Sequence, residues 1–211
     1  MGKEYPEPRC RSDGWLAATR HVPCPNWDER PPGRMVDLLV IHGISLPPGS
    51  FGGPWIEDLF QNRLDPEAYP EFRAIASLRV SSHLLIRRDG ELIQYVDLHK
   101  RAWHAGVSSF EGHPACNDFS IGIELEGADQ VPYEANQYRV LARTTQSIRT
   151  CFPNIGPERI VGHSDIAPGR KTDPGVAFDW KYFGALIGPC AAKTRDGQGR
   201  SKKAPLKKGR L

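Results

Sequence analysis

Two histidines and one aspartate are the residues best suited to bind a metal ion. His42 ends a nearly continuous aliphatic run, and His163 follows a shorter apolar run that breaks into a loop rich in Gly and Pro. Asp173 lies further along that loop. Two imidazoles and one carboxylate would form a tetrahedral zinc site with its fourth position open, as a catalytic zinc requires. Alternatively, His42 is a hydrogen-bonded core histidine and Asp173 a turn residue, and spacing alone does not decide.

Amide hydrolysis at such a site also needs a proton carrier and a positive charge near the reacting carbonyl. Lys171 lies two positions before Asp173, so in an extended stretch both side chains project to the same side. The segment 119–126 alternates strictly, with apolar residues on one face and Glu124 and Glu126 on the other. Alternation alone leaves both glutamates as candidates.

These residues need a sheet to position them. The aliphatic run predicts a strand over 35–42 that is buried on both faces. Strands over 80–87 and 91–97 flank Arg88-Asp89-Gly90, a hairpin pattern because Asp-Gly accepts the positive φ of a tight turn. The alternating segment 119–126 predicts a fourth strand.

Helical patterns lie between and after these strands, over 55–63, 66–77, 133–152 and 179–187. Strands mixed with helices predict an α/β fold with a central sheet flanked by helices. The hairpin makes that sheet mixed, because consecutive strands joined by a tight turn are antiparallel.

The chain has 211 residues, of which 39% are hydrophobic and 25% charged. This suits one folded domain, expected over 1–188. The sequence contains no membrane-spanning run, and its first residues do not resemble an export signal. Its five cysteines are odd in number and lack a CxxC pair, which argues against a disulfide framework or a cysteine zinc knuckle. We therefore expect a cytoplasmic protein.

The C-terminal segment differs in charge from the rest. Residues 191–211 contain eight Lys or Arg and one Asp, whereas the whole chain carries a net charge of +3. This segment has no aromatic residue to stack on a base and no apolar face to enter a bilayer. We predict a disordered, solubilising tail over 189–211, with neither a nucleic acid nor a membrane as partner.

Five segments carry a family pattern: LLVIHGISLPPGSFGGPWI, LRVSSHLLIRRDGELIQYV, KRAWHAGVSSFEG, CNDFSIGIELEG and VGHSDIAPGRKTDPGVAFDW. In this order and at near-matching intervals, they resemble the AmpD family of cytoplasmic 1,6-anhydro-N-acetylmuramyl-L-alanine amidases. The resemblance covers about 14–187. It implies the fold of these amidases and of the related peptidoglycan-recognition proteins, with one zinc ion per chain. It also implies hydrolysis of the bond between the lactyl group of the sugar and L-alanine during peptidoglycan recycling.

The resemblance also implies roles for the residues considered above. His42, His163 and Asp173 match the zinc ligands. Glu124 matches the catalytic glutamate, which selects it over Glu126, and Lys171 matches the lysine near the metal.

Three further residues match positions that contact substrate. Trp103 and His104 correspond to positions that line the groove. Arg79 resembles a residue that meets an acidic group of the stem peptide. Gly43 departs from the family pattern, in which Asn follows the first histidine.

The resemblance leaves one alternative from another functional class. Related recognition proteins keep the groove but lack a metal ligand, and they bind cell-wall fragments without hydrolysing them. The full set of His42, His163, Asp173, Glu124 and Lys171 favours the enzyme. We expect a monomer that acts on a small molecule, an anhydro-muropeptide.

Overall fold

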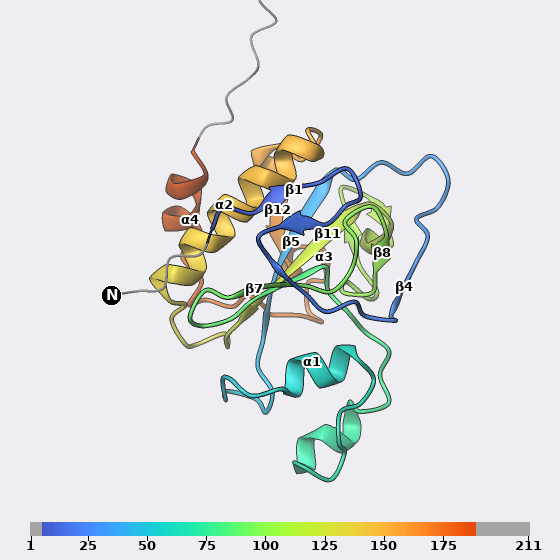
Figure 1. Cartoon of the computed structure of the whole chain (residues 1–211), viewed down its shortest axis with the longest axis vertical. Coiled ribbons are helices and arrows are strands. Elements are labelled where there is room, and N and C mark those ends of the chain that lie inside the picture. Colours follow the sequence, from blue (N-terminus) through green and yellow to red (C-terminus); the bar gives the residue numbers. More distant parts are fainter. Residues whose placement is uncertain (1–5, 189–211) are drawn as a thin grey trace, which may run out of the picture.

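A six-stranded mixed sheet runs through the centre of the molecule, and the computed structural model describes residues 6–188 around it (Figure 1). In spatial order its strands are β12 (Ile160–Gly162), β5 (Leu38–Ile44), β11 (Ser120–Glu126), β6 (Leu84–Ile86), β7 (Leu92–Gln94) and β3 (Arg20–His21). Neighbouring strands are parallel except for β6 and β7, which form the antiparallel hairpin. The predicted mixed sheet is confirmed. The tail predicted over 189–211 lies outside the described residues.

Two helices cover one face of this sheet. They are α2 (Ala135–Cys151) and α4 (Trp180–Ile187), both close to the predicted helical segments. The alternate side chains Ile121, Ile123 and Leu125 of β11 join the core cluster that these helices close, as the strict alternation predicts. The same alternation turns the two glutamates of β11 toward the opposite face.

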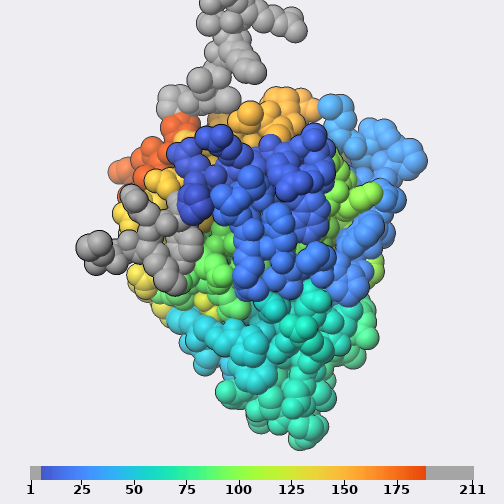
Figure 2. Space-filling model, viewed as in Figure 1, coloured from blue at the N-terminus to red at the C-terminus, as the bar shows by residue number. Residues whose placement is uncertain are grey.

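The opposite face carries smaller elements. The helix α1 (Trp55–Phe60) and the 3-10 helix η1 (Pro70–Ala74) form a lobe that packs on Leu85 and Ile93 through its own apolar cluster. This part of the chain makes the narrow end of the molecule in Figure 2. Short elements complete the face: α3 (His163–Ile166) and the 3-10 helices η2 (Cys116–Asp118) and η3 (Pro157–Arg159).

The helix predicted over 66–77 is wrong for most of its length. Only η1 forms there, and it is a 3-10 helix that begins at Pro70. The cause is local, because a residue before proline is driven out of the helical region, and Tyr69 has extended backbone angles of −148° and 144°. Pro66 and Pro70 also supply no N–H to a helical ladder.

Three two-stranded ribbons have no counterpart in the prediction. They pair β1 (Arg9–Cys10) with β2 (Leu16–Ala17), β4 (Trp27–Asp28) with β8 (Arg101–Ala102), and β9 (Ser109–Phe110) with β10 (His113–Pro114). Strands of two residues are too short to show a periodic pattern. The four described cysteines, Cys10, Cys24, Cys116 and Cys151, are free thiols. Within residues 6–188 we find no helix of the length and apolar character that crossing a bilayer demands.

Packing around the central strand β11 is expected to contribute strongly to the free energy of unfolding. Ile123 is completely buried between β5, β6 and the helical layer, so Ile123→Ala is expected to cost about 2–5 kcal/mol in the free energy of unfolding. Urea denaturation measures this as a lower midpoint with an unchanged m-value. Val176, which is 82% exposed, provides the control, and Val176→Ala should stay within about 0.5 kcal/mol of the wild type. Equal losses in both variants would contradict the packing described here.

Candidate metal centre and active site

The order of the strands brings the predicted residues together. β12, β5 and β11 are adjacent and parallel, so their C-terminal ends meet at one edge of the sheet. His42 pairs in register with Glu124 across β5 and β11. His163 begins α3 directly after β12, where Gly162 is in register with Ile41. Two of the predicted ligands and the predicted proton carrier therefore come from three neighbouring strands.

Asp173 reaches the same point from the loop after α3. One ligand atom from each of His42, His163 and Asp173 lies within 4.8 Å of the other two. His42 Nδ1 is 2.9 Å from His163 Nδ1, and Asp173 Oδ2 is 3.3 Å and 3.0 Å from these two nitrogens. Tetrahedral ligands about 2.0–2.1 Å from a zinc ion lie about 3.3 Å apart, so the spacing suits that ion.

Hydrogen bonds behind His42 determine which of its ring nitrogens carries the proton. Ser120 Oγ donates to the carbonyl of Cys116 at 2.6 Å, so it accepts from His104 Nε2 at 3.1 Å. His104 Nδ1 is then an acceptor for His42 Nε2–H at 2.9 Å. The relay leaves a lone pair on His42 Nδ1, the atom that faces the other two ligands.

A second set of contacts determines the state of His163. Arg170 Nη2 uses its two protons on the carbonyls of Ala105 and Val107, at 2.6 Å and 2.7 Å. It therefore has none left for His163 Nε2, which donates instead to the carbonyl of Ala105 at 3.1 Å. His163 Nδ1 therefore also carries a lone pair, and this lone pair is directed into the cluster.

Three acceptor atoms that face one another need a cation between them. Burial lowers the pKa of His42 to about 4, so this ring is neutral at pH 7. Two nitrogens and one carboxylate oxygen are a donor set that zinc accepts, so the residues present fit this ion.

The structure separates the two glutamates of β11. Glu126 forms an ion pair with Arg87 at 3.0 Å and accepts from the backbone N–H groups of Gly52 and Arg88. Glu124 is also buried, yet its Oε2 makes no hydrogen bond to any residue within 6–188. Burial raises the pKa of Glu124 well above its ordinary value, and the charge of Asp173 raises it further. Of the two glutamates of β11, Glu124 is therefore the one whose carboxylate has an oxygen left unpaired by the described residues.

Lys171 is exposed on the loop that carries Asp173, and its backbone N–H donates to the carbonyl of Ala167 at 3.0 Å. Its positive charge acts on the site, because it lowers the pKa of both His42 and Glu124. Each of these effects is smaller than that of burial. Lys171 thus adds positive charge in the surroundings of His42 and Glu124.

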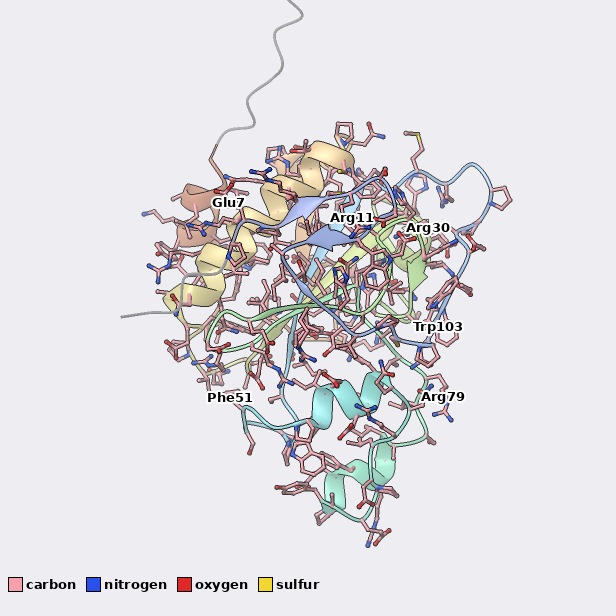
Figure 3. All side chains as sticks on the ribbon, viewed as in Figure 1. Glu7, Arg11, Arg30, Phe51, Arg79 and Trp103 are labelled. Carbon is pink, nitrogen blue, oxygen red and sulfur yellow. The ribbon has the colours of Figure 1, made fainter. Side chains whose placement is uncertain are left out.

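The three residues predicted to contact substrate differ in their burial and in their contacts. His104 is half-buried and contacts His42, so it supports the metal cluster whether or not it also lines a groove. Trp103 is half-buried beside it, and its backbone N–H donates a hydrogen bond to Ser81 Oγ. Arg79 is exposed, and its guanidinium contacts only the carbonyls of Ser77 and Leu78 among the described residues. Figure 3 has Arg79 and Trp103 on the same flank of the molecule.

Sequence reasoning missed the residues that support the ligands. Ser120, Arg170 and Tyr133 all contact the ligands or their neighbours, through hydrogen bonds to a ring or to the backbone. No pattern in the sequence marks Ser120 or Tyr133, since each acts through a distant partner. The only signal for Arg170 in the sequence is its position next to Lys171 in the same loop.

A cluster that attracts a cation, beside a buried and unpaired carboxylate, is typical of metal-dependent hydrolases. A family model described as N-acetylmuramoyl-L-alanine amidase matches residues 32–176. The chain is 58% identical over 174 residues to the 1,6-anhydro-N-acetylmuramyl-L-alanine amidase AmpD of Escherichia coli, a match that covers 82% of this chain and 94% of the relative. The chain therefore belongs to the N-acetylmuramoyl-L-alanine amidase family, as an enzyme of its AmpD branch.

Solved structures agree in fold. A crystal structure of a selenomethionine derivative of AmpD superimposes with a TM-score of 0.82 at 57% identity, covering 84% of this chain and 98% of that one. A structure of AmpDh3 from Pseudomonas aeruginosa in complex with an anhydromuramic pentapeptide has a TM-score of 0.54 at 31% identity, covering 74% of this chain and 61% of that one. The α/β fold predicted from the sequence is that of these amidases.

Proposed function

We propose that this enzyme hydrolyses the amide bond between the lactyl group of 1,6-anhydro-N-acetylmuramic acid and the L-alanine of its stem peptide, as a step in peptidoglycan recycling. The names of the similar proteins support this substrate class, since one is an anhydro-muramyl amidase and another binds an anhydromuramic pentapeptide. The observation that carries the proposal is the convergence of three proton-free acceptor atoms at the end of β5.

His42, His163 and Asp173 would hold one zinc ion through the atoms that face one another. When bound, zinc would polarise the amide carbonyl and make a water molecule more acidic. The relay from Ser120 through His104 keeps the lone pair of His42 aimed at the cluster, and the carbonyl of Ala105 does the same for His163. The protein thus holds its three metal-binding atoms in fixed positions.

Glu124 is proposed as the proton carrier. Its carboxylate takes a proton from the attacking water while the oxygen of that water bonds to the carbonyl carbon. It then returns the proton to the leaving nitrogen as the C–N bond breaks. The products are the carboxylic acid of the sugar and the free amino group of the peptide. The missing hydrogen-bond partner of Glu124 Oε2 supports this role, because a structural carboxylate would be paired.

Lys171 is proposed to stabilise the oxyanion that forms on the carbonyl oxygen. Its charge already acts on Glu124 and His42, and losing one such stabilising group typically lowers the rate by about 10²–10³-fold. Trp103 and His104 are proposed to line the groove for the sugar and peptide, and Arg79 to meet an acidic group of the stem peptide. We further propose that the enzyme acts as a monomer in the cytoplasm.

The proposal is tested with an anhydro-N-acetylmuramyl tripeptide in water enriched in ¹⁸O. With one equivalent of zinc, mass spectrometry should detect free tripeptide together with anhydro-sugar that carries one ¹⁸O atom in its new carboxyl group. A chelator should stop the reaction, and added zinc should restore it. The matching N-acetylmuramyl tripeptide without the anhydro ring provides the comparison and is expected to react more slowly.

Two outcomes would contradict the proposal. Binding of the muropeptide without release of peptide would favour a recognition module. Release of peptide that is unaffected by chelation would show that the reaction does not require the metal.

A further inference from the structure

Tyr133 lies outside the predicted site but is connected to it. The residue is buried just before α2, and its ring packs against Tyr138 and Phe178, whose ring centroids are 6.4 Å and 5.6 Å away. Its hydroxyl donates a hydrogen bond of 2.9 Å to the carbonyl of Pro174, the residue that follows Asp173. The hydroxyl therefore reaches the loop that carries the proposed carboxylate ligand.

Two glycines leave room for this tyrosine. A Cβ atom on Gly43 would lie 2.4 Å from the hydroxyl oxygen of Tyr133. A Cβ atom on Gly127 would lie 2.3 Å from its ring carbon Cε1. Gly43 directly follows His42 on β5, so the hydroxyl lies between the neighbours of two proposed ligands. This gives a structural reason for Gly43, where the sequence departs from the family pattern.

The loop around Asp173 is anchored on both sides of that residue. The carbonyl of Asp173 accepts a hydrogen bond of 3.0 Å from the backbone N–H of Ser164, in the helix that begins with His163. The next carbonyl, that of Pro174, is held by Tyr133. The Pro174 ring also packs closely on Gly162, where a Cβ atom would lie 2.9 Å from its Cδ atom. Without Tyr133, one of these two carbonyl anchors is lost.

We propose that Tyr133 is a positioning residue that holds Asp173 in the metal cluster through the carbonyl of Pro174. This inference rests on the proposed zinc site. The hydroxyl bonds to a backbone carbonyl and not to a ligand side chain, so its contribution is to keep the carboxylate at 3.0–3.3 Å from the two histidine nitrogens. Partners that orient metal ligands in this way typically contribute 10–100-fold to metal affinity.

Tyr133→Phe tests the inference because it removes the hydroxyl and keeps the ring. Zinc affinity, measured by competition with a chromophoric chelator, is expected to fall by about 10–100-fold. At saturating zinc, KM should stay near the wild-type value, since the substrate contacts are unchanged. Tyr138→Phe is the matched control: Tyr138 is also buried, and its hydroxyl accepts a hydrogen bond of 2.6 Å from the backbone N–H of Asp179, away from the cluster. Its zinc affinity should change less than about twofold.

Gly43→Ala provides a second measurement that does not remove the hydroxyl. The new methyl group would displace the hydroxyl from Pro174, so zinc affinity should fall in the wild-type background. In the Tyr133→Phe background the same substitution should have a smaller effect, because the hydroxyl is already gone.

The outcomes separate this inference from the proposed function. If the wild type and Tyr133→Phe bind zinc equally well, or if Tyr138→Phe loses as much affinity as Tyr133→Phe, the positioning role is overturned and the zinc site stands. If the wild type itself binds no zinc, the site and the positioning role both fall.

Discussion

Asp173→Asn is expected to bind zinc more than about 100-fold more weakly than the wild type, and to lose its amidase activity. The substitution keeps the shape of the side chain but removes the only negative charge among the three converging atoms. The two histidine nitrogens would then face a neutral amide. Since outer partners alone contribute 10–100-fold to metal affinity, loss of a direct ligand should exceed that range.

Thermal unfolding gives a readout that does not depend on the reaction. Zinc at 100 times its Kd should stabilise the wild type by about 2.7 kcal/mol, because it binds the folded state only. For a domain of this size that corresponds to a rise in Tm of roughly 5–10 °C. Asp173→Asn should show almost none of this rise at the same zinc concentration.

Two further variants control for a merely structural effect. Asp173→Cys restores a negatively charged zinc ligand and should recover part of the zinc-induced rise in Tm. Asp179→Asn alters a carboxylate that caps α4 at 2.8 Å from the backbone N–H of Tyr182. It should lower Tm slightly while leaving the response to zinc intact. A full response to zinc in Asp173→Asn would show that the ion binds elsewhere.

The sequence was sufficient to predict the elements that carry the site. The aliphatic run predicts β5 with His42 at its end, and the alternation of 119–126 places both glutamates of β11 on one face. Both patterns are local, since they follow from the period of a strand. The resemblance to the amidase family then selects Glu124, and the structure supplies a physical reason, because Arg87 already pairs with Glu126.

The parts that could not be predicted are those that depend on distant contacts. No local pattern tells which strands are neighbours, yet the order β12, β5, β11 is what brings His163 beside His42. The relay through His104 ends on a backbone carbonyl, that of Cys116, which a sequence does not display. The hydrogen bond from the Tyr133 hydroxyl to the carbonyl of Pro174 likewise joins residues that are 41 positions apart.

Glu124→Gln is expected to lower kcat by about 10²–10⁴-fold while making the metal-free protein more stable at neutral pH. The loss of rate follows from removal of the proposed proton carrier. The gain in stability follows from burial, because the carboxylate of Glu124 has an oxygen that finds no hydrogen-bond partner in the described part of the chain. An ionised group in that position costs folding free energy, and the neutral amide should recover about 1–3 kcal/mol of it.

The dependence of this gain on pH follows from the direction of the pKa shift. The pKa of Glu124 is raised in the folded state above its ordinary value of 4.5. Below that value the side chain is protonated in both the folded and the unfolded chain, so wild type and variant should differ little in stability. As the pH rises above it, the unfolded chain releases the proton first and the wild type loses stability. The difference in Tm between Glu124→Gln and wild type should therefore grow as the pH increases, measured in the presence of a chelator.

Glu126→Gln is the matched control, since it changes the same residue type on the same strand and face. Glu126 is paired with Arg87 and with two backbone N–H groups, so its loss should cost about 2–4 kcal/mol at neutral pH. The kcat of this variant, measured where it is folded, should stay close to that of the wild type. The two glutamates are thus expected to have opposite effects: one lowers stability and provides catalysis, and the other stabilises the sheet. If Glu126→Gln lost the rate and Glu124→Gln kept it, the assignment of the proton carrier would be wrong.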